Sequence, residues 1–124
     1  MTPKQQREAL QYNLSSLILL QDKHQENIVL FETFIKKERE GVIFDKTIQS
    51  TLEDRLRLHK SNTVPLNDAD VELIKQDLPK ILSNIERRAE SVKNLQSAIL
   101  NEQEQMDREE QMITFLVKRR DSKE

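Results

Sequence analysis

The sequence predicts an all-α protein, an elongated helical hairpin or three-helix arrangement of two long helices and one short helix, with a coiled-coil C-terminal helix. Of its 124 residues, 34% are charged, 4% are aromatic and one is a glycine, a composition typical of long helices. Apolar residues also recur at alternating spacings of three and four, the pattern of helices that pack on other helices. We expect one elongated domain that spans residues 1–124.

The first helix is expected over about residues 3–40. Thr2 and Gln5 have the spacing of a capping box, and Pro3 suits the first helical position. Gly41 can adopt the left-handed conformation that ends many helices. The mostly apolar stripe of this segment comprises Leu10, Leu14, Leu17, Gln21, His24, Ile28, Phe31 and Ile35. Further apolar residues beside the stripe indicate that the helix contacts more than one other helix.

A short second helix is expected over about residues 45–60. Residues 41–44 form a link before it, and Asp45 is its candidate N-cap. Pro65 disfavours a helical conformation at Val64. The stretch around these two residues is therefore expected to be a loop.

The third helix is expected over about residues 68–118, with Asn67 or Asp68 as its cap. Pro79 conflicts with this assignment, because a proline inside a helix costs about 3 kcal/mol and bends the helix. It falls on the outer face, so we predict a kink near Pro79, with a restart at Leu78 as the alternative. Residues 119–124 are expected to fray.

A strict seven-residue repeat runs through the third helix. Its a positions are Val71, Leu78, Ile85, Val92, Ile99, Met106 and Ile113. Its d positions are Ile74, Ile81, Arg88, Leu95, Glu102, Glu109 and Leu116. One helix cannot bury its own stripe, so these positions must face other helices.

The charged d positions constrain the partner of this stripe. In a parallel, in-register homodimer, Arg88, Glu102 and Glu109 would each face their own copy, which is unfavourable. We therefore favour association with other helical chains over a parallel homodimer, with antiparallel pairing also compatible. The third helix is longer than the first, so its late stripe is expected to lack a partner within the chain. The predicted partner-binding residues are Val92, Leu95, Ile99, Glu102, Met106, Glu109, Ile113 and Leu116.

No motif in the sequence indicates catalysis. A single glycine excludes the glycine-rich phosphate loops and nucleophile elbows of common enzyme families. His24 and His59 are the two histidines, and neither belongs to a metal-binding pair. We interpret His24, which lies near Gln21 on the first stripe, as part of a hydrogen-bonded polar layer. The expectation is a non-enzyme with no catalytic residues, no metal, no cofactor and no small-molecule substrate.

Charge and hydropathy exclude several partners. The net charge of −2 and the mixing of basic with acidic residues argue against nucleic-acid binding as the function. The apolar runs are too short for membrane insertion, and the first residues lack the apolar region of a signal peptide. We expect an intracellular protein, cytoplasmic or nuclear.

These observations favour a non-catalytic scaffold subunit of a multi-protein complex that associates through coiled-coil and helix-bundle packing. A free-standing three-helix chaperone or adaptor that binds a protein client is the alternative. The two differ in the behaviour of the isolated chain, because an adaptor should be a compact, cooperatively folded monomer.

Overall fold

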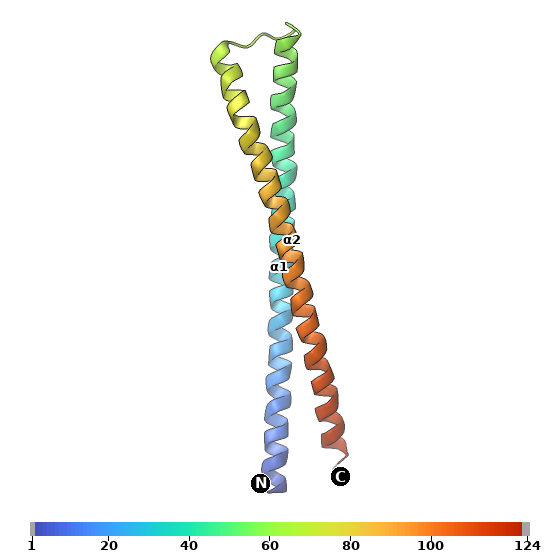
Figure 1. Ribbon diagram of the computed structural model, residues 1–124. Coiled ribbons are helices and arrows are strands. Elements are labelled where there is room, and N and C mark those ends of the chain that lie inside the picture. Colours follow the sequence, from blue (N-terminus) through green and yellow to red (C-terminus); the bar gives the residue numbers. More distant parts are fainter. Residues whose placement is uncertain (1, 123–124) are drawn as a thin grey trace. The chain divides into compact units, whose positions relative to one another are not determined.

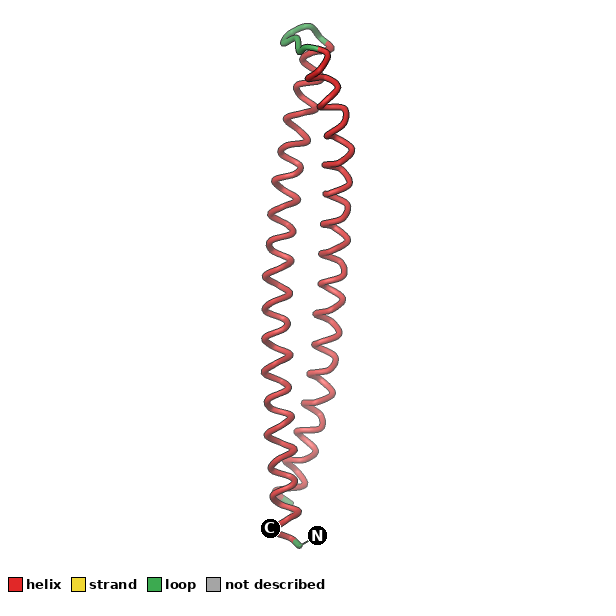
Figure 2. The backbone as a smooth tube through the Cα atoms, turned by 90° about the vertical axis from the view of Figure 1, so that its left-hand side faces the viewer, coloured by secondary structure: helices red, strands yellow, loops and turns green. Residues whose placement is uncertain are grey.

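The computed structural model describes residues 2–122, which form two helices joined by a loop (Figure 1). Helix α1 spans Pro3–Lys60 and helix α2 spans Asp68–Asp121. Residues 61–67 connect them, and the described residues contain no strand (Figure 2). The all-α prediction with two long helices is confirmed, but the predicted third, short helix is not present as a separate element.

Helix α1 continues through the predicted link at residues 41–44, so the expected end of the first helix near residue 40 is wrong. Gly41 does not adopt a positive φ and therefore does not act as a C-cap. Asp45, predicted to be an N-cap, lies inside the helix and is buried. The heptad spacing explains this continuity, because Val42 follows Ile35 by seven residues and Leu56 lies two heptads after Val42.

The ends of the helices are held by specific hydrogen bonds. Thr2 and Gln5 form the predicted capping box, with the Gln5 amide donating to Thr2 Oγ1 at 3.2 Å and the Thr2 amide donating to Gln5 Oε1 at 2.9 Å. At the other end of α1, Asn62 adopts a φ of 58° and its amide donates to the His59 carbonyl at 3.0 Å. This left-handed residue ends α1 as a glycine commonly does in other helices.

Asn67, rather than Asp68, caps α2, because its side-chain oxygen accepts a hydrogen bond of 2.8 Å from the Asp70 amide. Helix α2 runs through Pro79 without a restart at Leu78. The predicted fraying of residues 119–124 is wrong for Arg119, Arg120 and Asp121, which are helical. The last two residues of that prediction, 123 and 124, lie outside the described part of the chain.

The described residues divide into two units, and each contains part of both helices. Unit 1 comprises residues 2–32 and 96–122, and unit 2 is Thr33–Leu95. In each unit the two helices run antiparallel (Figure 1), and the burial pattern indicates that side chains at heptad positions form a seam between them. Every seam residue is buried or half-buried. The packing of α2 on α1 therefore follows the heptad repeat within both units.

The α1 residues of the seam are Leu10, Leu14, Leu17, Gln21, His24, Ile28 and Phe31 in unit 1, and Ile35, Glu38, Val42, Asp45, Gln49, Leu52, Leu56 and His59 in unit 2. The α2 residues are the a and d positions already named, from Val71 to Leu95 in unit 2 and from Ile99 to Leu116 in unit 1. The heptad of α1 is thus as regular as that of α2. Its polar members hid this regularity in the sequence.

Candidate functional site

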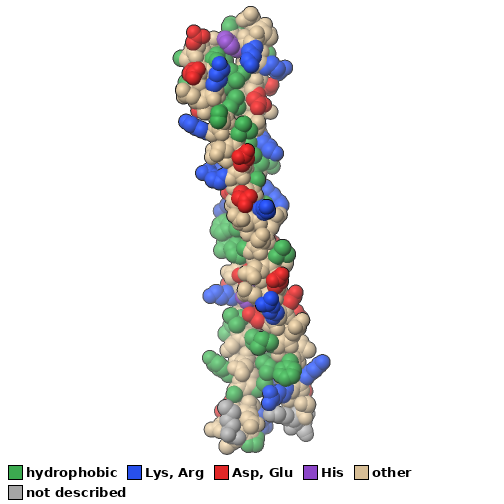
Figure 3. Space-filling model, in the orientation of Figure 1, with side chains coloured by type: hydrophobic (Ala, Val, Ile, Leu, Met, Phe, Trp, Pro, Cys, Tyr) green, Lys and Arg blue, Asp and Glu red, His purple; other side chains and the backbone are tan. Residues whose placement is uncertain are grey.

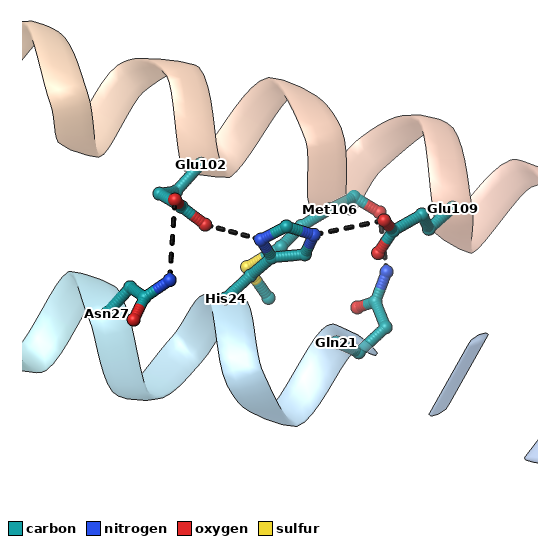
Figure 4. Close-up of polar contacts among 6 residues, drawn as sticks. All are labelled: Gln21, His24, Asn27, Glu102, Met106 and Glu109. Carbon is teal, nitrogen blue, oxygen red and sulfur yellow. Dashed lines mark hydrogen bonds and ion pairs between the residues drawn. The ribbon is translucent and has the colours of Figure 1, made fainter. Parts of the chain in front are cut away.

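The most prominent polar group in unit 1 is the His24 clamp, defined here as His24 with Glu102 and Glu109 (Figure 4). The imidazole of α1 lies between two carboxylates that are one heptad apart on α2. Its Nδ1 contacts Glu102 Oε2, and its Nε2 lies 2.9 Å from Glu109 Oε1. The His24 side chain is 12% exposed and those of both glutamates are 17% exposed, so the clamp is largely shielded from water.

The geometry of the His24 clamp favours the charged form of the imidazole. A neutral imidazole has one N–H, so it would direct a lone pair at one of the two carboxylates. The imidazolium donates to both. The hydrogen bond with Glu109 raises the pKa of His24 most strongly, the hydrogen bond with Glu102 raises it further, and burial opposes them in part.

Two amide side chains of α1 extend this polar layer. Gln21 Nε2 donates to the backbone carbonyl of Met106 at 2.7 Å, and Asn27 Nδ2 donates to Glu102 Oε1 at 3.5 Å (Figure 4). The interpretation of His24 as part of a hydrogen-bonded polar layer is therefore confirmed. The layer joins α1 to α2 by four polar contacts within one short stretch of unit 1.

A second polar group, the Arg88 clamp, lies in unit 2 and reverses the roles of the helices. Arg88 of α2 lies between Glu38 and Asp45 of α1, with Nη1 3.3 Å from Glu38 Oε1 and Nε 3.1 Å from Asp45 Oδ2. Asp45 is 8% exposed. A cation thus again stands between two carboxylates that are one heptad apart.

Gly41 makes room for the Arg88 guanidinium. A Cβ atom at Gly41 would lie 2.5 Å from Arg88 Cζ and 2.9 Å from Nε, closer than van der Waals contact permits. The single glycine of the chain therefore allows an arginine to cross the surface of α1 and reach both carboxylates. This steric role accounts for Gly41 inside a continuous helix, where glycine would otherwise cost about 1 kcal/mol relative to alanine.

The two clamps specify one antiparallel register. On α1, Glu38 lies 14 residues after His24, and on α2, Arg88 lies 14 residues before Glu102. A slip of either helix by one heptad would leave a carboxylate of each clamp without its cation. Leaving a buried charge unpaired is strongly unfavourable, and polar seam residues are a known means of fixing register.

The structure places all eight predicted partner-binding residues on the seam with α1. They are half-buried by the protein's own helices: Val92 and Leu95 in unit 2, and Ile99, Glu102, Met106, Glu109, Ile113 and Leu116 in unit 1. The expectation that the late stripe lacks a partner within the chain is wrong for Glu102, Met106 and Glu109, which contact His24 or Gln21. The charges at d positions pair with charges of α1.

Sequence reasoning missed the role of Glu38 and Asp45. Glu38 and Asp45 are seven residues apart, and they continue the heptad repeat of α1 that includes His24. The available signal was the matching pattern on the two helices, a cation on one and two heptad-spaced carboxylates on the other. Because Gly41 was predicted to end the first helix, Asp45 was not expected to lie on the same heptad repeat as His24.

The clamps do not resemble a catalytic or metal centre. The two carboxylates approach opposite nitrogens of His24, so the three side chains do not converge on a point where an ion or a substrate atom could bind. Across residues 2–122, no group of three or more histidine, cysteine or acidic side chains has the arrangement of a metal site. The geometry instead suits a structural interaction between helices.

The outer surface differs on the two sides of the seam. We define the preceding flank as the residues that directly precede a seam residue and the following flank as those that directly follow one. Following-flank residues are exposed, with Val117 as the exception, whereas several preceding-flank residues, such as Asn27, Gly41 and Ile48, are half-buried. Apolar side chains reach the surface among charged ones along the described chain (Figure 3).

Neither helix contains an apolar stretch of the length needed to cross a membrane within the part of the chain that the structure describes. Comparison of the chain with protein-family models, with curated proteins and with solved structures found no match.

Proposed function

We propose that this protein is a non-catalytic structural subunit of a multi-protein complex. It associates with other helical chains by helix-bundle packing, and heteromeric assembly is favoured over a parallel homodimer. The clamps contribute by fixing the register of the protein's own helices, which presents a defined outer surface to a partner. The following observations support this proposal.

The observation that carries the proposal is a set of exposed apolar side chains on the preceding flank of unit 1. Leu20 and Leu30 of α1 are 43% and 49% exposed, and Met112 and Phe115 of α2 are 54% and 62% exposed. Fully burying such a side chain contributes about 1.5–3 kcal/mol. A third helix against this flank would cover them.

The preceding flank of unit 1 also carries few charged residues, and these are all basic. In unit 1 its ionisable residues are Lys23 and Arg108, and it contains no acidic residue. The remaining positions are apolar, small or uncharged: Ala9, Asn13, Ser16, Asn27, Ala98, Asn101 and Gln105. Small side chains permit close approach of another helix, and the few charges impose little desolvation cost.

The seam supports the same conclusion. Among the described residues, the apolar side chains with less than a tenth of their surface exposed are Leu14, Ile28, Ile35 and Ile74. Two helices alone leave both edges of a seam open to solvent, whereas bundles of three or four helices close it. The predicted partner-binding residues, from Val92 to Leu116, retain exposed surface at these edges.

The proposal is tested by affinity purification of the tagged protein, expressed at its native level, with identification of chains that co-purify stoichiometrically. The variant Leu30→Asp/Phe115→Asp places two charges on the preceding flank of unit 1 and should lose the partner chain. The matched control is Leu19→Asp, because Leu19 is 68% exposed and adjoins the seam on neither side. Circular dichroism should show unchanged helix content in both variants.

If the double variant retains its full set of partners, the preceding flank is not the contact surface and the proposal fails in its present form. A monomeric chaperone or adaptor predicts a different outcome. It would yield many clients in amounts well below one per chain, and the isolated chain would remain a monomer.

A further inference from the structure

The following flank of unit 2 contains an apolar groove between α1 and α2. The groove has a volume of about 430 Å³ and is lined by Arg39, Val42, Ile43, Ala89 and Val92. The short side chain of Ala89 is one of those that line this space. Ile43 is 67% exposed at the edge of the groove. An aliphatic side chain from another molecule could fill this space.

Basic residues predominate on the flank that contains this groove. On the following flank of unit 2 there are seven basic residues and three acidic ones. The basic residues are Lys36, Arg39, Lys46, Arg57, Lys60, Lys75 and Lys93, and the acidic ones are Glu53, Glu72 and Glu86. The following flank of unit 2 therefore has a net charge of +4 within a chain whose net charge is −2.

The following flank of unit 1 has the opposite charge. It carries four acidic residues, Asp22, Glu32, Asp107 and Glu110, and no basic residue. Asp107 and Glu110 line a shallow hollow of about 420 Å³ with Gln111 and Thr114. The same flank exposes three aliphatic side chains, Ile18 at 51%, Val29 at 53% and Leu100 at 61%.

We propose that a second copy of this chain is the occupant of these surfaces. The acidic following flank of unit 1 in one copy docks on the basic, grooved following flank of unit 2 in the other. Ile18 or Leu100 enters the groove, while Asp107 and Glu110 receive basic side chains such as Arg39 or Lys46. The proposal goes beyond the association with other chains, which uses the preceding flank.

Three features favour a second copy over a different protein. The two flanks are complementary in charge, with a net of four negative charges on one and four positive charges on the other. Each flank exposes aliphatic side chains within its charged rim. Both flanks also belong to the same chain, so each copy offers an acidic and a basic surface to another copy.

The full-length protein is the material for the test, and sedimentation equilibrium at low salt measures its dimer dissociation constant. Ile43→Asp should weaken dimerisation at least about tenfold, the loss expected when a buried interface anchor is replaced by a charge. Phe44→Asp is the matched control, because Phe44 adjoins Ile43, is 66% exposed against 67% for Ile43, and lies on the preceding flank. It should leave the constant unchanged.

Charge reversal provides the second arm. Arg39→Glu/Lys46→Glu and Asp107→Lys/Glu110→Lys should each weaken the dimer, and the four changes combined should restore it. Higher salt should weaken the native dimer, since the exposed charges that steer the contact are screened. Restoration requires the two flanks to face each other, so it excludes a mere loss of folding.

Several results would overturn the proposal. A protein that stays monomeric at concentrations of about 100 µM, well above a micromolar dissociation constant, does not form this contact. A dimer that Ile43→Asp leaves intact, or that the four combined changes fail to restore, uses another surface. In each case co-purification of a different helical chain would still uphold the proposed function, so the two failures are distinguishable.

Discussion

A cation between two heptad-spaced carboxylates is the recurring arrangement among the side chains. His24 of α1 occupies it in unit 1 and Arg88 of α2 occupies it in unit 2. Each cation meets two carboxylates, so removing one partner leaves a charge in a shielded position. The two clamps differ in their cation, which is an imidazole with a raised pKa in the His24 clamp and a guanidinium in the Arg88 clamp.

The stability of the protein should therefore depend on pH through His24. Its pKa is raised in the folded state, so the clamp contributes fully below the unfolded value of about 6.5. This contribution is lost as the pH rises through the higher folded value. Urea unfolding monitored by circular dichroism between pH 6 and 9 should show a falling free energy of unfolding.

The control for this prediction is His24→Gln, which should flatten the pH dependence over the same range. His59→Gln leaves the clamp intact and should preserve the slope that His24 causes. A native protein whose stability does not fall between pH 6 and 9 would show that the imidazolium is not stabilised by Glu102 and Glu109.

Gly41 and Arg88 should be thermodynamically coupled. Gly→Ala inside a helix ordinarily stabilises by about 1 kcal/mol. At position 41 the new methyl group meets the guanidinium, so we expect this gain to be absent in the native protein. In an Arg88→Met background the gain should appear. Equal gains in both backgrounds, measured by chemical unfolding, would contradict the steric role of Gly41.

At the scale of the elements, the heptad repeat predicted α2 well and α1 only in part. The apolar a positions of α2 made its seam visible, and its observed span matches the expectation within a few residues. In α1 the seam includes Gln21, His24, Glu38, Asp45 and Gln49, so polarity concealed the repeat. The glycine at position 41 was therefore taken as a helix end, because helix ends are predicted from neighbouring residues. The residue that explains this glycine, Arg88, lies far away in the sequence.

The candidate site was predictable to the same degree. The charged d positions of α2 signalled a polar layer, and His24 was assigned to one from the sequence. The pairing of Arg88 with Glu38 and Asp45 could not be read from α2 alone. It depends on the antiparallel register, which follows from combining the two heptads with the charge pattern. Which residues remain exposed on the flanks depends, in addition, on how the other helix covers each edge of the seam.

Pro79 should destabilise α2, because it lacks the amide that would donate to the carbonyl of Lys75. Its side chain is exposed, so Pro79→Ala removes little packing. We expect this change to raise the free energy of unfolding by about 1–3 kcal/mol. Pro65→Ala in the loop should have the opposite sign, with a loss of about 0.4–1 kcal/mol from greater freedom of the unfolded chain. Stabilities that shift in the same direction would refute this distinction.

For the whole molecule, the two flanks of the seam support two different proposed contacts. The preceding flank carries exposed leucine, methionine and phenylalanine side chains and supports the proposed association with other helical chains. The following flank carries opposite charges in the two units and supports the proposed self-association. The two proposed contacts therefore use different flanks. The polar clamps fix the register of the two helices and thereby the arrangement of side chains on both flanks.

Native mass spectrometry of the complex, isolated at endogenous level, tests the central claim of a structural subunit most directly. The account predicts an assembly that contains two copies of this chain and at least one different helical chain in fixed stoichiometry. Leu30→Asp/Phe115→Asp should remove the different chain and leave the two copies together. Recovery of the native protein as a single chain, without a stoichiometric partner, would contradict the account.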